Sequence, residues 1–86
     1  MTEKARPSLE RVEWSDHTSL SAGWVPVEDV NALKPSRILT VGWIVCEDEN
    51  SVTVASCRDV SNEKYDSIIC IIKTNIIKRR KLREPA

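Results

Sequence analysis

The chain has 86 residues, a length that allows one small domain. Thirteen basic and thirteen acidic side chains give a formal net charge of zero, which argues against a polybasic protein that coats nucleic acid. The longest apolar stretch, residues 67–72, is far shorter than the roughly 18–20 residues that cross a bilayer, and the amino-terminal residues lack the apolar core of a secretory signal.

The first quarter of the chain is polar and predicts little regular structure besides one strand. Residues 1–8 are expected to form a flexible segment. Residues 9–16 place three apolar side chains among charges, which predicts a short strand ending at Ser15-Asp16. Residues 17–24 are rich in small side chains and predict a loop.

A short helix is expected next. Val27, Val30 and Leu33 recur at every third position, and Pro26 suits the first turn of a helix. Pro35 ends the segment, because a residue before proline avoids the helical conformation. The pattern predicts one or two helical turns.

The middle of the chain predicts a β-hairpin. Residues 38–46 are apolar at both alternating sets of positions, which indicates a central strand, and Gly42 within it suggests a bulge or a bend. Residues 47–50 form an acidic turn, and residues 51–57 return as a second strand of high β propensity.

The last third of the chain predicts two more strands. A polar loop is expected over residues 58–66, and residues 67–73 form the most hydrophobic strand. A 3₁₀ turn at Thr74-Asn75 would lead into a final strand over residues 76–82. Simple alternation in that strand would place Ile77, Arg79 and Lys81 on one face and Ile76, Lys78, Arg80 and Leu82 on the other.

Five short strands and one brief helix favour a single mainly β domain over residues 9–82, followed by a tail over residues 83–86. The expected architecture is a closed five-stranded antiparallel barrel, since closure would protect the edges of such apolar strands. An open sheet with the helix on one face is the alternative. A further possibility is that surplus apolar surface packs in a homo-oligomer.

The three cysteines indicate a reducing compartment. Cys46, Cys57 and Cys70 make an odd count without a signal peptide, and each lies in an apolar β-type run, so we expect small buried side chains rather than disulfides. With His17 as the single histidine and no Cys-x-x-Cys pair, a zinc site is not expected.

Few residues suggest catalysis. Asp16 and His17 are adjacent, but neighbours in sequence rarely adopt the geometry of a base and its orienting carboxylate, and no cysteine is identified as a partner nucleophile for His17. Gly23 and Gly42 are the only glycines, so a phosphate-binding loop cannot be built and no cofactor is expected. We expect a protein that is not an enzyme.

Charge is unevenly distributed along the chain. Residues 73–86 carry a net charge of +5 and residues 1–72 a net charge of −5. This asymmetry predicts a candidate anion or nucleic-acid site, against the alternative of a solvated last strand and tail. The candidate residues are Lys73, Lys78, Arg79, Arg80 and Lys81.

Aromatic side chains could add stacking surfaces to such a site. Trp14 and Trp43 lie in strand patterns and are expected in the core. Trp24 and Tyr65 are the candidates for exposed aromatic residues.

Several motifs in this order resemble a family of small uncharacterised proteins encoded by bacteriophages and prophages. The motifs are residues 12–16 (VEWSD), 23–24 (GW), 41–45 (VGWIV) with 47–48 (ED), 52–55 (VTVA) and 71–76 (IIKTNI). The family pattern has a proline where this chain has Ile72, which puts the turn at Lys73 in question. The resemblance implies an accessory protein in the cytoplasm of a bacterial host and assigns no catalytic residue.

A weaker likeness at the level of fold is to SH3-like and Sm-like barrels, which bind peptides, RNA or copies of themselves. The leading hypothesis is a non-enzymatic, self-associating binding module that acts on a host protein or a signalling nucleotide. The alternative is an Sm-like RNA or DNA binder that uses the basic carboxyl-terminal segment.

Overall fold

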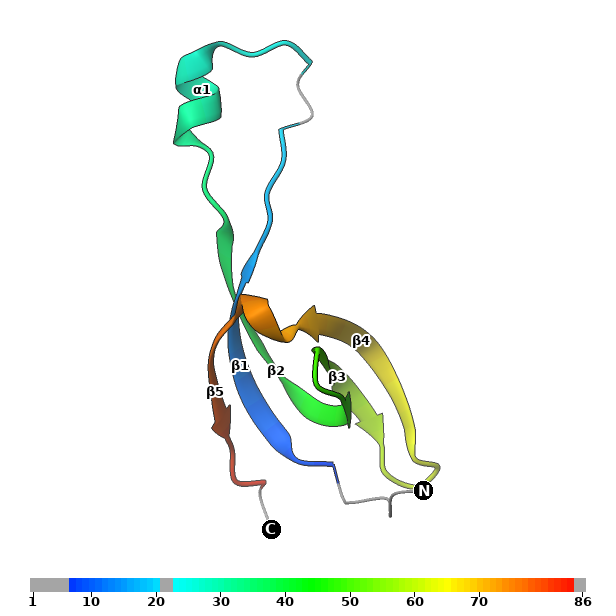
Figure 1. The fold of residues 1–86 in the computed structure, drawn as a ribbon. Helices are drawn as coiled ribbons and strands as arrows, with labels where there is room; N and C mark the ends of the chain where they lie inside the picture. Colours follow the sequence, from blue (N-terminus) through cyan, green and yellow to red (C-terminus); the bar gives the residue numbers. More distant parts are fainter. Residues whose placement is uncertain (1–6, 21–22, 85–86) are drawn as a thin grey trace.

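The structure, a computed structural model, describes residues 7–20 and 23–84. This part of the chain contains five strands, one short α-helix and one 3₁₀ turn (Figure 1). In chain order they are β1 (Leu9–Asp16), α1 (Val27–Ala32), β2 (Ser36–Glu47), β3 (Ser51–Asp59), β4 (Lys64–Ile72), η1 (Lys73–Asn75) and β5 (Ile76–Lys81). The predicted mainly β class is confirmed. Most of the segment predicted to be flexible at residues 1–8, and the middle of the predicted 17–24 loop, lie outside the described residues.

All five strands belong to one antiparallel sheet with the order β4-β3-β2-β1-β5. β2 is central, as predicted. Within the described residues no ladder joins β4 to β5, so the sheet is open, and its closure into a barrel stays a prediction. The 3₁₀ turn η1 connects these two edge strands at one end of the sheet, and they diverge from there (Figure 1).

The core lies on the concave face of the sheet. Its buried members alternate along the strands, as expected for strands with one covered face: Val12, Trp14, Val52, Val54 and Ile71. The indole Nε1 of Trp14 donates to Thr40 Oγ1 at 3.0 Å, which satisfies its polar atom inside the core. Trp14 is therefore buried as predicted, whereas Trp43 is only half-buried, with Arg58 5.9 Å from the centre of its ring.

Gly42 is required by a close approach of two strands. A Cβ added there would lie 2.8 Å from the carbonyl carbon of Ala55 and 2.9 Å from Val54 Cγ1. The predicted irregularity of β2 does occur, but between Ile44 and Cys46 rather than at Gly42. Gly42 thus provides room for β3, and the bulge lies farther along the strand.

Two expectations about the second half of the chain are wrong. β3 continues to Asp59 and β4 begins at Lys64, so most of the predicted 58–66 loop is strand. In β5, residue Ile77 is extra relative to β1, because Trp14 pairs with Ile76 and Glu13 with Lys78. This irregularity turns both Ile76 and Arg79 toward the core, against the simple alternation expected.

The cysteines differ from expectation as well. Cys46, Cys57 and Cys70 are free thiols, and all three are exposed. Cys70 pairs with Thr53 on the face of β4 opposite to the buried Ile71, so its position in an apolar run does not bury it. The strand is apolar on both faces, but only one face is covered within this single chain.

The most conspicuous feature is an arm, residues 17–35, which joins β1 to β2 and carries α1 (Figure 1). The arm projects away from the sheet and makes the molecule elongated, with extents of 52 × 26 × 24 Å. The Cα radius of gyration is 16.6 Å, against about 12 Å for a compact domain of this length. Helix α1 has the position predicted from the sequence. No helix among the described residues is long and apolar enough to cross a membrane.

Candidate functional site

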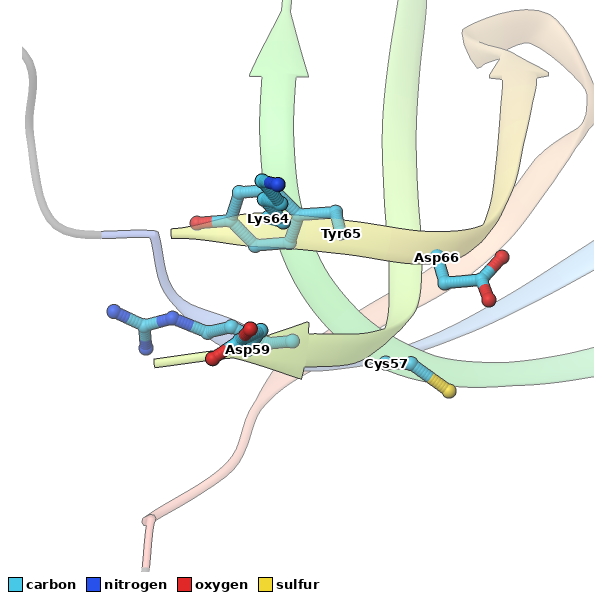
Figure 2. A pocket seen from close by; sticks show the side chains of 6 residues that line it. Cys57, Asp59, Lys64, Tyr65 and Asp66 are labelled. Carbon is cyan, nitrogen blue, oxygen red and sulfur yellow. The ribbon is translucent and has the colours of Figure 1, made fainter. Parts of the chain in front are cut away.

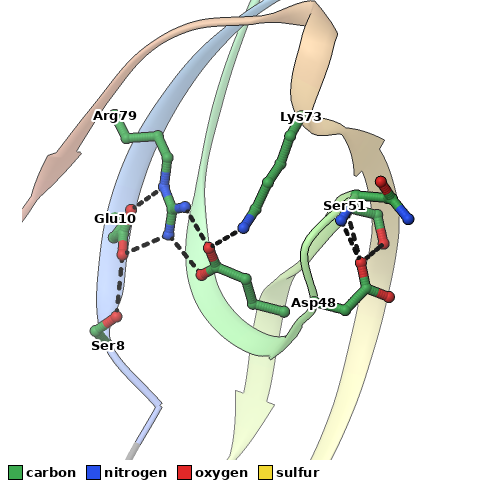
Figure 3. A network of polar contacts seen from close by, with 8 residues as sticks. Ser8, Glu10, Asp48, Ser51, Lys73 and Arg79 are labelled. Atoms are coloured by element: carbon green, nitrogen blue, oxygen red, sulfur yellow. Dashed lines mark hydrogen bonds and ion pairs between the residues drawn. The ribbon is translucent and has the colours of Figure 1, made fainter.

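A network of ionic side chains joins β1, β5 and η1 to the carboxyl end of β2 (Figure 3). Arg79 donates to both oxygens of Glu10, from Nε at 2.8 Å and from Nη2 at 3.1 Å. It also donates to both oxygens of Glu47, from Nη1 at 2.9 Å and from Nη2 at 3.0 Å. One guanidinium therefore links three strands through two bidentate contacts.

Neighbouring groups complete this network. Lys73 Nζ lies 2.8 Å from Glu47 Oε2, and Ser8 Oγ donates to Glu10 Oε2 at 3.2 Å. In the adjoining turn, Asp48 Oδ1 accepts from the backbone N–H groups of Asn50 at 2.7 Å and of Ser51 at 2.8 Å. No described side chain leaves a buried polar atom without a partner.

These contacts shift the pKa values of two residues in the network. The hydrogen bonds from Arg79 and then Lys73 lower the pKa of Glu47 from 4.5 to about 2. The hydrogen bonds from Glu47 and then Glu10 raise the pKa of Arg79 further above its ordinary range. Both partners are therefore ionised at neutral pH, and their charges compensate each other.

The network divides the candidate anion site into two groups. Arg79 and Lys73 are engaged with carboxylates, so a ligand would have to compete with Glu10 and Glu47 for them. Lys78, Arg80 and Lys81 are exposed along β5, and none forms an ion pair with a residue of the described ranges.

The two candidate aromatic residues lie away from this basic strand. Trp24 is fully exposed on the arm. Tyr65 belongs to β4, at the opposite edge of the sheet from β5, and its hydroxyl donates to Glu63 at 3.2 Å. The described chain therefore does not assemble the basic and aromatic candidates into one site.

Tyr65 lines a shallow pocket of about 280 Å³ at the β3–β4 hairpin (Figure 2). Its other lining residues are Cys57, Arg58, Asp59, Lys64 and Asp66. Charges of both signs face this pocket, and Arg58 is bound to Glu63 at 3.0 Å, so no excess of positive charge is available for an anion. The pocket also lies at the end of the molecule away from the arm (Figure 1).

The arm presents the largest group of exposed apolar side chains on one segment. It carries Leu20, Trp24, Val27, Val30 and Leu33, all of them exposed. No residue of α1 is buried, and no side chain caps its first turn. A shallow hollow of about 360 Å³ on the arm is lined by Leu20, Val25, Asp29, Ala32 and Leu33. An exposed cluster of this kind is typical of an interaction surface.

A second apolar patch lies on the outer face of β2, the strand that follows the arm in the chain. Leu39 and Val41 are 55% and 49% exposed, and they pair across the ladder with Glu13 and Arg11 of β1. Glu13 is buried there beneath its ion pairs with Arg37 and Arg11. Two guanidinium groups share this carboxylate, so these three side chains together keep one net positive charge.

The histidine candidate is in open solvent. His17 is 94% exposed in its side chain, and its Nδ1 lies 3.4 Å from Asp16 Oδ1. The two side chains thus lie close together in open solvent. No group of three or more potential metal ligands is present among the described residues.

Sequence reasoning missed the two buried carboxylates, Glu10 and Glu13. A signal for Glu10 existed, because it shares alternate positions with Val12 and Trp14, which are core residues. Its basic partner could not be found, because the irregularity at Ile77 changes which β5 residues face inward.

Comparisons with protein-family models, with curated proteins and with solved structures gave no significant match. The likeness to phage and prophage proteins therefore rests on the sequence motifs, and the functional argument rests on the geometry of the chain.

Proposed function

We propose that this protein is a non-enzymatic binding module, a phage-type accessory protein that contacts a host protein through the arm. The observation that supports this proposal is the set of five exposed apolar side chains on residues 17–35, including a fully exposed tryptophan. Exposed tryptophan is a preferred anchor of protein interfaces, because its large ring gives much contact area for little lost conformational freedom.

The rest of the chain suits the role of a scaffold. The ionic network around Arg79 ties β1, β2 and β5 together, and every buried polar side-chain atom described has a partner. In this proposal the five strands form an SH3-like or Sm-like barrel that carries the arm in the bacterial cytoplasm.

The proposal is tested by affinity capture from a bacterial lysate with quantitative mass spectrometry. We expect proteins enriched on the wild type to be lost on Trp24→Ala/Val30→Asp, because this variant removes the apolar anchor. The matched control is Lys78→Ala/Arg80→Ala, which alters exposed residues on β5 and should retain the same proteins. Equal capture by wild type and arm variant would overturn the proposal.

A second candidate function is binding of an anionic ligand, a nucleic acid or a signalling nucleotide, by β5. It is supported by the three exposed basic residues Lys78, Arg80 and Lys81, which lack a carboxylate partner in the described chain. A fluorescent oligonucleotide titrated at 50 and 200 mM salt tests it. Binding must weaken with salt and disappear in the triple alanine variant, because phosphate contacts release counterions.

A further inference from the structure

The arm cannot be stable as an isolated projection. Helix α1 has six residues and buries none of them, whereas isolated helices in water need about 12–15 residues to form. The backbone bonds that flank its turns are local, such as Asp29 N to Pro26 O at 3.0 Å and Leu33 N to Val30 O at 3.2 Å. Some surface must therefore cover Val27, Val30 and Leu33 if the helix is to persist.

The chain as a whole exposes more surface than a compact monomer of its mass. The chain exposes 7004 Å², against about 5,200 Å² expected for a compact monomer of its mass. Half of this excess would already equal the roughly 800 Å² that each partner contributes to an interface of standard size. All of it, contributed by two copies, would lie in the range of obligate homodimers, about 2,000–5,000 Å².

The charges on the arm and on the sheet indicate which surface could cover the arm. Glu28 and Asp29 lie in the first turn of α1, beside Val27 and Val30, and the helix carries no basic residue. The outer face of β1 and β2 at the base of the arm has the complementary character: the apolar Leu39 and Val41 lie beside Arg11 and Arg37, and Arg37 is 72% exposed. The same chain thus carries an acidic apolar surface and a basic apolar surface.

We propose that the arm of one copy docks on the outer β1–β2 face of a second copy, and that the second copy reciprocates. A two-fold axis between α1 and Leu39 sets each acidic helix on the partner's basic face, and it buries both apolar patches at once. This inference rests on one premise of the proposed function, that the arm is a protein-contact surface. It names a second copy of this chain as the partner.

Two charge variants test the reciprocity. Glu28→Lys/Asp29→Lys places a basic helix against a basic face, and Leu39→Glu places an acidic helix against a carboxylate on a face that has lost its net positive charge. We expect each variant alone to dimerise at least tenfold more weakly than the wild type. Mixed in equal amounts, the two should form a heterodimer near wild-type affinity, because one contact becomes lysine on glutamate and the other remains as in the wild type.

The measurement is sedimentation equilibrium from 1 to 100 µM under reducing conditions, because the three exposed thiols could otherwise cross-link copies. A merely misfolded variant would not be rescued by mixing. Ile72→Asp on the outer face of β4 is the control, and it should leave the dimer intact.

Three results would overturn the inference. They are a monomeric wild type at 100 µM, an assembly lost in Ile72→Asp but not in the arm variant, and charge variants that fail to recover on mixing. If the wild type is monomeric yet arm variants lose a captured host protein, the inference fails and the proposed function stands. If arm variants change neither the molecular mass in solution nor the set of captured proteins, both the inference and the proposed function fail.

Discussion

Gly42 lies in β2 at a point where the backbone of β3 leaves no room for a side chain. Gly42→Ala would place a Cβ 2.8 Å from the carbonyl carbon of Ala55, and backbone cannot move aside as a flexible side chain can. We expect the free energy of unfolding to fall by about 2 kcal/mol, in the range of overpacked cores. Chemical denaturation followed by tryptophan fluorescence measures it.

Ser56→Ala is the matched control for this prediction. It removes one exposed hydroxyl that donates to Val41 O at 3.2 Å on the same pair of strands. We expect a loss below about 1 kcal/mol. Equal effects of the two substitutions would show that β3 can move away from β2 without cost.

A second prediction at residue scale concerns pH. The folded pKa of Glu47 is about 2, below its ordinary value of 4.5, because Arg79 and Lys73 stabilise the ionised carboxylate. Its contribution to stability is therefore complete above pH 4.5 and is lost as the pH falls from 4.5 toward 2. Since a third of the side chain is exposed, we expect a loss of about 1 kcal/mol at most.

Urea denaturation at pH 6, 4.5, 3 and 2 measures this loss. Glu47→Gln has no carboxyl to titrate, so the difference in stability between wild type and variant should shrink over that interval. Asp48 and Asp59, whose pKa values are also lowered, titrate equally in both proteins and cancel in the comparison. A difference independent of pH would contradict the assignment.

At the scale of elements, Arg79 joins β5 to β1 and β2. Arg79→Ala would leave Glu10, only 4% exposed, as a buried carboxylate without its guanidinium. We expect destabilisation of about 3 kcal/mol, as for broken buried ion pairs. The exposed neighbour provides the control, since Arg80→Ala should change stability by about 0.5 kcal/mol or less.

A double variant separates the loss of contacts from the exposure of a buried charge. Glu10→Leu/Arg79→Leu leaves no buried charge, so it should be more stable than Arg79→Ala. If the double variant is destabilised relative to the wild type as much as Arg79→Ala is, the lost bidentate contacts account for the effect, and the buried charge does not.

The arm, unlike the sheet, has few contacts that hold its backbone in place. Its amides have few backbone partners, and α1 buries no side chain. In the Glu28→Lys/Asp29→Lys variant we expect α1 amides to exchange with solvent far faster than those of β1 and β2, because few contacts oppose local opening. Hydrogen exchange with mass spectrometry of peptides measures this contrast, and equal protection would contradict it.

For the whole molecule, the elongated shape gives a scattering prediction. A monomeric variant with an extended arm should have a radius of gyration near 16.6 Å, rather than the roughly 12 Å of a compact domain. Small-angle X-ray scattering distinguishes the two values. A compact result would mean that the arm folds back over the sheet of its own chain.

Much of the fold follows from local pattern, because alternation and turn residues act over a few positions. The strand over residues 9–16, the short helix, the hairpin at residues 47–50 and the 3₁₀ turn before β5 were all predictable. The orientation of Arg79 was not, since it depends on how Ile77 is accommodated opposite β1.

Burial was the harder quantity to predict, because it depends on what covers each face. Cys70 and Ile72 lie in a strand with apolar residues on both faces, but a single chain covers only the face of Ile71. For the same reason the anion site could not be assigned from charge alone: the carboxylates that neutralise Arg79 are distant in sequence.

The contact between Glu10 and Arg79 also has a consequence for synthesis on the ribosome. The two residues are 69 positions apart, so at about 5–20 residues per second Arg79 is added roughly 3–14 seconds after Glu10. During that interval β1 can pair only with β2, and its second edge and its acidic side chain remain open to water. The nascent chain is therefore most vulnerable to aggregation and proteolysis before β5 emerges.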